Sequence, residues 1–310
     1  MAAVCFYVLK SMKEGKNMRW FSNKRIKVIM LAPVILLFLV YIVIPVVMAF
    51  YYSFTDFTGI GKPNMIGFTN YQRLFQDDVF YTALKNTGII LALSLVLIVP
   101  GSFGLSLLLN RKIRGSKLMQ ALCFSPNIIS PILVGLIWVF ILDPQIGLIN
   151  ALLRAAGSSW QPQWIGGRVL TPYCVAVIFL WQTLGYNATI FLAGIRGVPR
   201  ELYEASSIDG ASGVQQLRYI TLPMIRQTIV IVMLLVITGC FKIYEIVYQL
   251  TNGGPNHLSE TLVTYMYYST FTSSRYGYGM SIASVAFLLS AIFAAVYIYF
   301  AKENVGGDAE

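Results

Sequence analysis

Long apolar stretches separated by short polar segments run along this chain of 310 residues. A helix that crosses about 30 Å of hydrocarbon at about 1.5 Å per residue needs roughly 20 apolar residues. Six stretches approach that length, and they cover Val28–Phe50, Thr87–Leu109, Leu118–Leu142, Val169–Ile195, Thr228–Leu250 and Met280–Phe300. The pattern therefore predicts an all-α, polytopic membrane protein with six transmembrane helices.

The third and fourth stretches contain residues that would interrupt a helix in water, namely Pro126, Pro131, Pro172 and Gly185. Inside a helix bundle, neighbouring helices and hydroxyl side chains can satisfy the backbone groups that such residues free. We therefore predict that both stretches still cross the membrane.

Composition and charge agree with this assignment and orient it. Only 12% of the residues are charged and 57% are hydrophobic, against roughly 25% charged in a soluble domain. With the N-terminus in the cytoplasm, 16 of the 23 Lys and Arg residues fall in inner segments, six fall outside, and Lys242 lies within a span. By the positive-inside rule both termini are cytoplasmic, as tails at residues 1–27 and 304–310 around a transmembrane domain at 28–303.

The net charge of +10 is thus explained by topology and contact with the lipid bilayer, and we expect no nucleic-acid partner. We also expect no catalytic residues and no metal site, because the chain has one histidine and no Cys or His pair at ligand spacing. The nearest approach to a phosphate-binding loop, DFTGIGKPN, has Asp56 at the first glycine position and Pro63 after the lysine. The chain is not expected to bind ATP.

The cytoplasmic loop at residues 196–226 is long and polar. Pro199 fits the first turn of a helix and Gly210 fits the left-handed position that ends one, which predicts a helix of about ten residues between them. Leu202, Ala205 and Ile208 share one face of that helix. Thr221 is predicted to cap a second helix that continues through Leu222 and Pro223 into the fifth span.

Two interpretations of the short helix remain open on physical grounds. It is either an interfacial helix on the inner leaflet or a helix held by a partner protein. A membrane-bound helix favours Lys or Arg on its polar face, whereas this helix carries Glu201, Glu204 and Asp209.

The sequence EASSIDGASGVQQLRYITLP resembles the signature of binding-protein-dependent ABC importer permeases, which is E-A-A, three residues, G, nine residues, I-x-L-P. The positions that match are Glu204, Ala205, Gly210, Ile220, Leu222 and Pro223. The flanking sequences WQTLGYNATIFLAGIRGVPRELYEA and YQLTNGGPNHLSETLVTYMYY are similar to the carbohydrate-type permeases of the maltose, multiple-sugar and glycerol-phosphate systems. Ser206 and Gln227 depart mildly from the family pattern, which has Ala and often Pro at these positions.

This resemblance implies a type I ABC importer permease fold in a bacterial cytoplasmic (inner) membrane. It implies that the short helix is a coupling helix, which docks into an ATP-binding cassette subunit that holds the ATP and Mg²⁺. The implied partners are a second permease subunit, two ATPase subunits and an extracytoplasmic solute-binding protein, with a sugar or oligosaccharide as substrate. The coupling residues carried over are Glu204, Ala205, Ser206, Asp209, Gly210, Ala211, Ile220, Leu222 and Pro223.

The substrate path is expected along the fourth and fifth spans, where aromatic, amide and charged side chains interrupt apolar sequence. The candidates are Gln182, Gly185, Tyr186, Asn187, Lys242, Tyr244 and Glu245. Alternatively, Gln182 and Asn187 only hydrogen-bond between helices. Lys242 and Glu245, three residues apart, are expected on one helix face, either neutralising each other or forming a polar wall of the path.

Two other functional classes compete with the importer. A secondary transporter driven by an ion gradient would require a carboxylate relay in the membrane, but Glu245 is the only acidic residue within a predicted span. An intramembrane enzyme would require a nucleophile paired with a base, and the sequence suggests no such pair.

Overall fold

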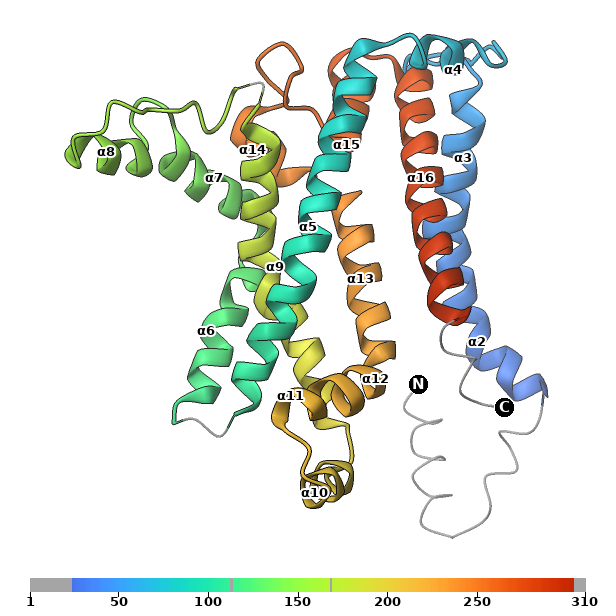
Figure 1. Ribbon diagram of the computed structural model, residues 1–310. Coiled ribbons are helices and arrows are strands. Elements are labelled where there is room, and N and C mark those ends of the chain that lie inside the picture. Colours follow the sequence, from blue (N-terminus) through green and yellow to red (C-terminus); the bar gives the residue numbers. More distant parts are fainter. Residues whose placement is uncertain (1–23, 112–113, 168, 304–310) are drawn as a thin grey trace, which may run out of the picture. The chain divides into compact units, whose positions relative to one another are not determined.

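The computed structural model describes residues 24–111, 114–167 and 169–303, and these ranges are helical apart from loops and one isolated bridge between Thr55 and Met65 (Figure 1). The predicted tails therefore lie almost wholly outside the described residues. The chain divides into two compact units, residues 1–51 and 52–310. The first unit contains α2 (Lys24–Phe38), the π-helical turn η2 (Leu39–Val43) and most of α3 (Ile44–Ser53), which together form the first predicted span.

Three long helices form the frame of the second unit: α5 (Asp78–Asn110), α9 (Thr171–Arg196) and α16 (Tyr276–Glu303). Each is long and apolar enough to cross a membrane. Helix α5 packs along α9 and also contacts α13 (Arg226–Cys240). Buried apolar side chains from these helices make the core, including Phe80, Ile90, Ile98, Ile178, Phe191, Val232, Val236 and Ile282.

The third predicted span is bent sharply in its middle. Helices α6 (Ser116–Ile128) and α7 (Pro131–Leu142) meet at an angle of 96°. Ser130 precedes a proline and has an extended backbone with ψ of 134°, because the proline ring clashes with a helical conformation at the residue before it. The stretch is therefore one broken span or two helices that do not cross as one, and its crossing of the membrane stays a prediction.

The prediction of a continuous helix over Thr228–Leu250 is wrong. Helix α13 ends at Cys240, and α14 (Glu245–Thr251) begins after four residues outside helical structure. Lys242 and Glu245 consequently do not share a helix face, which corrects that expectation. Before α13, a helical run through α11 (Gly213–Gln216), η3 (Leu217–Thr221) and α12 (Leu222–Met224) meets it at 69°.

Four single helices in the described ranges can therefore span a membrane, and the number becomes six if each bent pair is one crossing. The remaining elements are α4 (Thr69–Leu74), α8 (Leu148–Ala155), α10 (Arg200–Ile208), α15 (Leu262–Tyr267) and η4 (Tyr268–Thr272). Within the second unit, α10 lies at one end, whereas α8 and α14 lie at the opposite end (Figure 1).

This separation makes the predicted orientation testable at two exposed residues, Asn256 in the loop after α14 and Ser212 after α10. In intact cells, Asn256→Cys should react with an impermeant thiol reagent. The excess of Lys and Arg in the predicted inner segments places the loop after α14 on the outer side of the membrane. Ser212→Cys should react only after permeabilisation. Labelling of the wild-type chain gives the background, and the reverse pattern at the two sites would show the orientation to be inverted.

Candidate functional site

Helix α10 begins directly after Pro199 and ends in a Schellman motif. The Ala211 N–H donates to the Ser206 carbonyl at 2.9 Å, and the Gly210 N–H donates to the Ser207 carbonyl at 3.2 Å. Gly210 has φ of +80°, in the left-handed region that this motif requires and that favours glycine. The predicted boundaries of this helix are confirmed.

The chain after α10 folds back and fastens it. The Tyr203 and Thr221 hydroxyl groups share a hydrogen bond of 2.9 Å. The side-chain amide of Gln216 lies within hydrogen-bonding distance of three α10 acceptors, the Tyr203 carbonyl and the hydroxyl oxygens of Ser206 and Ser207, at 2.9–3.3 Å. Neither Tyr203 nor Gln216 was among the predicted residues. Because their bonds span 9–18 residues of sequence, no local motif indicated them.

The outer surface of α10 is left uncovered by the described residues of its own chain. None of its residues is buried, and Ile208 is 87% exposed. Glu204 and Ala205 are exposed together on this surface, as are Asp209 and Gly210. A rigid helix that presents carboxylates, small residues and an apolar side chain can bind a partner of complementary charge and shape.

The predicted N-cap at Thr221 is wrong. Thr221 has helical φ and ψ of −64° and −54° within a continuous helical run, and its buried side chain bonds to Tyr203 instead. The cap is Ser212, whose hydroxyl accepts from the Gln215 N–H while the Gln215 side chain accepts from the Ser212 N–H. Ser-x-x-Gln is a capping box, so the signal was present nine residues upstream of the predicted cap. The same helical run contains the other predicted coupling residues, with Ile220 directly before Thr221 and Leu222 and Pro223 directly after it.

Two candidate path residues of α9, Gln182 and Gly185, lie against α6 and the bend that follows it. The Gln182 side-chain amide donates to the Ile129 carbonyl at 3.3 Å, and a Cβ atom at Gly185 would collide with the Cys123 carbonyl. Asn187 is buried, and its amide nitrogen donates to the Thr183 carbonyl at 3.0 Å. Its amide oxygen is also buried and has no hydrogen-bond partner among the described residues.

Tyr186 is half-buried, with its ring centroid 6.3 Å from that of Phe124. The other three candidates surround the break between α13 and α14. Tyr244 stacks on Tyr248 with ring centroids 5.3 Å apart, and Lys242 is exposed beside a largely apolar hollow of about 210 Å³. Glu245 begins α14. Within the described ranges, no hydrogen bond, ion pair or ring contact joins these three to the α9 candidates.

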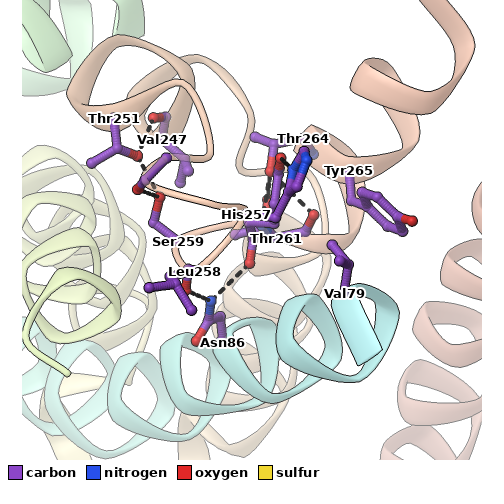
Figure 2. A network of polar contacts seen from close by, with 12 residues as sticks. Val79, Asn86, Val247, Thr251, His257, Leu258, Ser259, Thr261, Thr264 and Tyr265 are labelled. Atoms are coloured by element: carbon purple, nitrogen blue, oxygen red, sulfur yellow. Dashed lines mark hydrogen bonds and ion pairs between the residues drawn. The ribbon is translucent and has the colours of Figure 1, made fainter. Parts of the chain in front are cut away.

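At the end opposite α10, a polar network holds the loop between α14 and α15 (Figure 2). The Asn86 amide donates to the Leu258 and Glu260 carbonyls, both at 2.9 Å. Thr251 and Ser259 share a hydroxyl bond of 2.7 Å, and Thr261 caps α15. Sequence reasoning missed this network, whose only local signal was a polar Asn86–Thr87 pair at the start of the second predicted span.

Asp77 connects three helices near this network. It caps α5 by accepting from the Val79 N–H at 2.9 Å, and it accepts from the hydroxyl groups of Tyr265 and Tyr278. Burial favours the neutral carboxyl group, but the bonds from these hydroxyl and backbone N–H groups outweigh burial and hold the pKa of Asp77 below its ordinary value of 3.8. This stabilisation is complete above that value and is lost as the pH falls through the lowered pKa.

Comparisons with known proteins agree with the resemblance. Residues 98–303 match the family described as binding-protein-dependent transport system inner membrane component. The probable ABC transporter permease protein YurN of Bacillus subtilis (strain 168) is 33% identical over 285 residues, which cover 91% of this chain and 97% of that protein. The probable starch degradation products transport system permease protein AmyD of Thermoanaerobacterium thermosulfurigenes is 27% identical over 290 residues, 94% of this chain and 98% of its own length.

A solved structure of similar fold is the crystal structure of a bacterial alginate ABC transporter in complex with alginate pentasaccharide-bound periplasmic protein. The superposed chain has a TM-score of 0.73 and 27% sequence identity, and the match covers 91% of this chain and 95% of that one.

The Asp77 contacts predict that two adjacent carboxylates, Asp77 and Asp78, contribute differently to the free energy of unfolding. Asp77→Ala removes a cap and two charged hydrogen bonds and should lower the free energy of unfolding by about 1.5–3 kcal/mol. Asp78→Ala, at the exposed next position, is the matched control and should cost less. Thermal unfolding of the purified transporter measures both, and equal melting temperatures for the two variants would contradict the assignment.

Proposed function

Because this chain belongs to the family of binding-protein-dependent transport system inner membrane components, we propose that it is a permease subunit of an ATP-driven importer for a sugar or oligosaccharide. The observation that carries this proposal is α10, a short helix with no buried residue that is fastened rigidly to its own chain. A fixed, exposed helix is suited to transmit the movement of a docked ATPase to the spans.

The coupling mechanism follows from the exposure of α10. ATP and Mg²⁺ would be held in two partner ATPase subunits, whose closure moves the docked α10. Glu204 would meet a basic group of the docking cleft, while Ala205, Ser206 and Ala211 allow close approach. The Schellman motif at Gly210 would aim the helix, and Tyr203 and Gln216 would keep it from rotating independently of α11.

The partners and orientation belong to the same proposal. A second permease subunit would complete the pathway, and an extracytoplasmic binding protein would deliver the substrate. The alginate transporter, which is bound to a substrate-loaded periplasmic protein, supports the presence of a binding protein. In this arrangement α10 and both termini are cytoplasmic, and the loop after α14 is outside.

The competing secondary transporter is disfavoured by the family assignment and by the break at Lys242. Helix α13 ends before Lys242, so Lys242 and Glu245 are not paired on one helix. A proton or ion relay along the fifth span would need such a pair of charged side chains.

For the substrate path we propose Tyr186 and Asn187 first. The buried, unpartnered amide oxygen of Asn187 is costly unless a donor reaches it, and a sugar hydroxyl is such a donor. Gln182 and Gly185 instead support the bend after α6. Gln182 binds the free carbonyl of Ile129, and Gly185 lets the backbone of α6 at Cys123 approach α9 closely. Tyr244, with Lys242 and Glu245, would border the path at the break before α14.

Coupling is tested by changing charge on α10. Glu204→Lys should weaken docking of the ATPase by on the order of 2–5 kcal/mol, because it leaves a buried basic partner without its counter-charge. Glu201→Lys, an equal charge change one turn earlier on the same helix and outside the family signature, is the matched control and should have a smaller effect. Co-purification of the ATPase and stimulation of ATP hydrolysis by the binding protein measure the outcome. If both variants transport and hydrolyse like the wild type, α10 does not couple.

Gly210→Val tests the Schellman motif separately. Valine opposes the left-handed backbone, so the helix should be misdirected and hydrolysis uncoupled from transport, while the chain still inserts. Gly213→Val lies nearby at a residue without positive φ and serves as control. Equal uptake by the two variants would show that the aim of α10 is not critical.

The path is tested with Tyr186→Ala and Asn187→Ala. Both should lower sugar uptake while assembly and basal ATP hydrolysis remain nearly normal. Thr189→Ala, which removes another half-buried polar side chain of α9, is the control. Loss of assembly in the first two variants would show that they act in packing between helices, as the alternative holds.

A further inference from the structure

The polar network at the end opposite α10 borders an open pocket of about 320 Å³, near the lower limit of roughly 300–1,000 Å³ for small-molecule sites. It lies outside the proposed path residues. Its walls come from α14, the following loop, α15 and η4, and the lining residues are Tyr248, Asn252, Gly253, Gly254, Asn256, His257, Glu260, Thr264, Tyr267, Tyr268 and Thr272.

Aromatic rings form much of this wall. Tyr248 and Tyr267 are perpendicular neighbours with ring centroids 6.0 Å apart, and Tyr244 packs against both. The ring centroids of Tyr268 and His257 are 4.5 Å apart. Such rings offer flat apolar faces with polar edges, which suit a ring-shaped ligand that has C–H faces and hydroxyl edges.

The polar groups of the pocket are held in place by an unusual loop. Asn252, Asn256 and His257 have φ of 48°, 47° and 60°, a conformation that side chains other than glycine adopt rarely. A cluster of such residues persists only where the surrounding structure fixes it, and it occurs often at ligand sites. Here the Asn86 amide and the Thr251–Ser259 bond fix the loop (Figure 2).

A buried carboxylate completes the site. Glu260 is 1% exposed, and its Oε1 lies 2.9 Å from Nδ1 of His257. Its Oε2 is buried and has no hydrogen-bond partner among the described residues. Leaving a buried carboxyl oxygen without a hydrogen-bond partner is costly, so a ligand hydroxyl group that bonds to it would be stabilised here.

We propose that this pocket is an outer binding subsite for one ring of a neutral saccharide, occupied before the sugar enters the spans. The inference rests on the proposed function and narrows its substrate class. The lining contains a carboxylate and no Lys or Arg among the described residues, so an anionic sugar or a sugar phosphate would lack a counter-charge. Tyrosine rings would cover one face of the sugar, while Glu260 and the two asparagines bind its hydroxyl groups.

The test uses the complete transporter with its partner permease and ATPases. Thr272→Cys places a small, exposed thiol in the lining, and Ser159→Cys, also exposed but outside it, is the control. The probes are glucose, maltose, cellobiose and N,N′-diacetylchitobiose, with glucuronate and glycerol 3-phosphate as anionic counterparts. ATP-driven uptake of each probe, delivered by the binding protein, is measured in parallel in proteoliposomes.

A neutral saccharide that is taken up should slow maleimide labelling of Thr272→Cys about tenfold when present at ten times its dissociation constant. It should leave Ser159→Cys unchanged, and the anionic probes should protect neither thiol. Uptake of a neutral saccharide without protection overturns the subsite alone. Equal protection by an anionic probe overturns the neutral class, and a Thr272→Cys thiol that never reacts shows a pocket closed in the assembly, which also overturns the proposal.

Absence of ATP-driven uptake for every saccharide is a separate outcome, which overturns the proposed function and the subsite that rests on it.

A second variant pair checks the aromatic wall. Tyr248→Leu should raise the half-protecting sugar concentration roughly threefold to tenfold, whereas Tyr248→Phe, which keeps the ring face, should change it less. Tyr81→Leu, an exposed tyrosine outside the pocket, is the control, and an equal effect of Tyr248→Leu and Tyr81→Leu would count against stacking.

Discussion

Backbone groups cannot be left without partners where water is excluded, and this constraint governs the structure. It acts most clearly at the two places where a predicted span is broken. Between α6 and α7 the free carbonyl of Ile129 accepts from the side chain of Gln182 on α9. Between α13 and α14 the carbonyl of Ile243 accepts from the hydroxyl of Thr261 at 3.1 Å. In both places a polar side chain from another segment makes an irregular backbone tolerable.

The two ends of the bundle use polar side chains in opposite ways. At the α10 end, bonds from Tyr203 and Gln216 join the short helix to its own chain and leave its outer surface exposed. At the other end, Asp77 and Asn86 bind a loop and two helices together, and Glu260 is buried among them. The α10 end therefore presents a fixed, exposed helix, whereas the opposite end holds a loop in place beside a pocket. This difference is expected if a protein docks at the α10 end and a small ligand binds at the other.

The sequence allowed the number and placement of apolar segments, and the bounds of α10, to be predicted, because both depend on local signals such as hydrophobic length, Pro199 and Gly210. It did not reveal the breaks at residues 129–130 and 241–244. Apolar composition continues through both, and whether a proline or a polar residue ends a helix depends on a partner such as Gln182, far away in sequence. The outer network escaped prediction for the same reason, since Asn86 and the carbonyls it binds are more than 170 residues apart.

Helix α13 connects the two ends physically. Its first turn follows the helical run that contains Thr221, the residue bonded to α10. Its 15 residues span about 22 Å, and its far end leads into the break before α14, where Tyr244 contacts Tyr248 and Tyr267 of the pocket wall. A rigid helix between a fastened joint and an irregular segment transmits displacement to the segment, because the break is the part that can bend. On the proposed mechanism, movement of α10 would therefore change the pocket wall and the border of the path together, through one helix and without a separate signal.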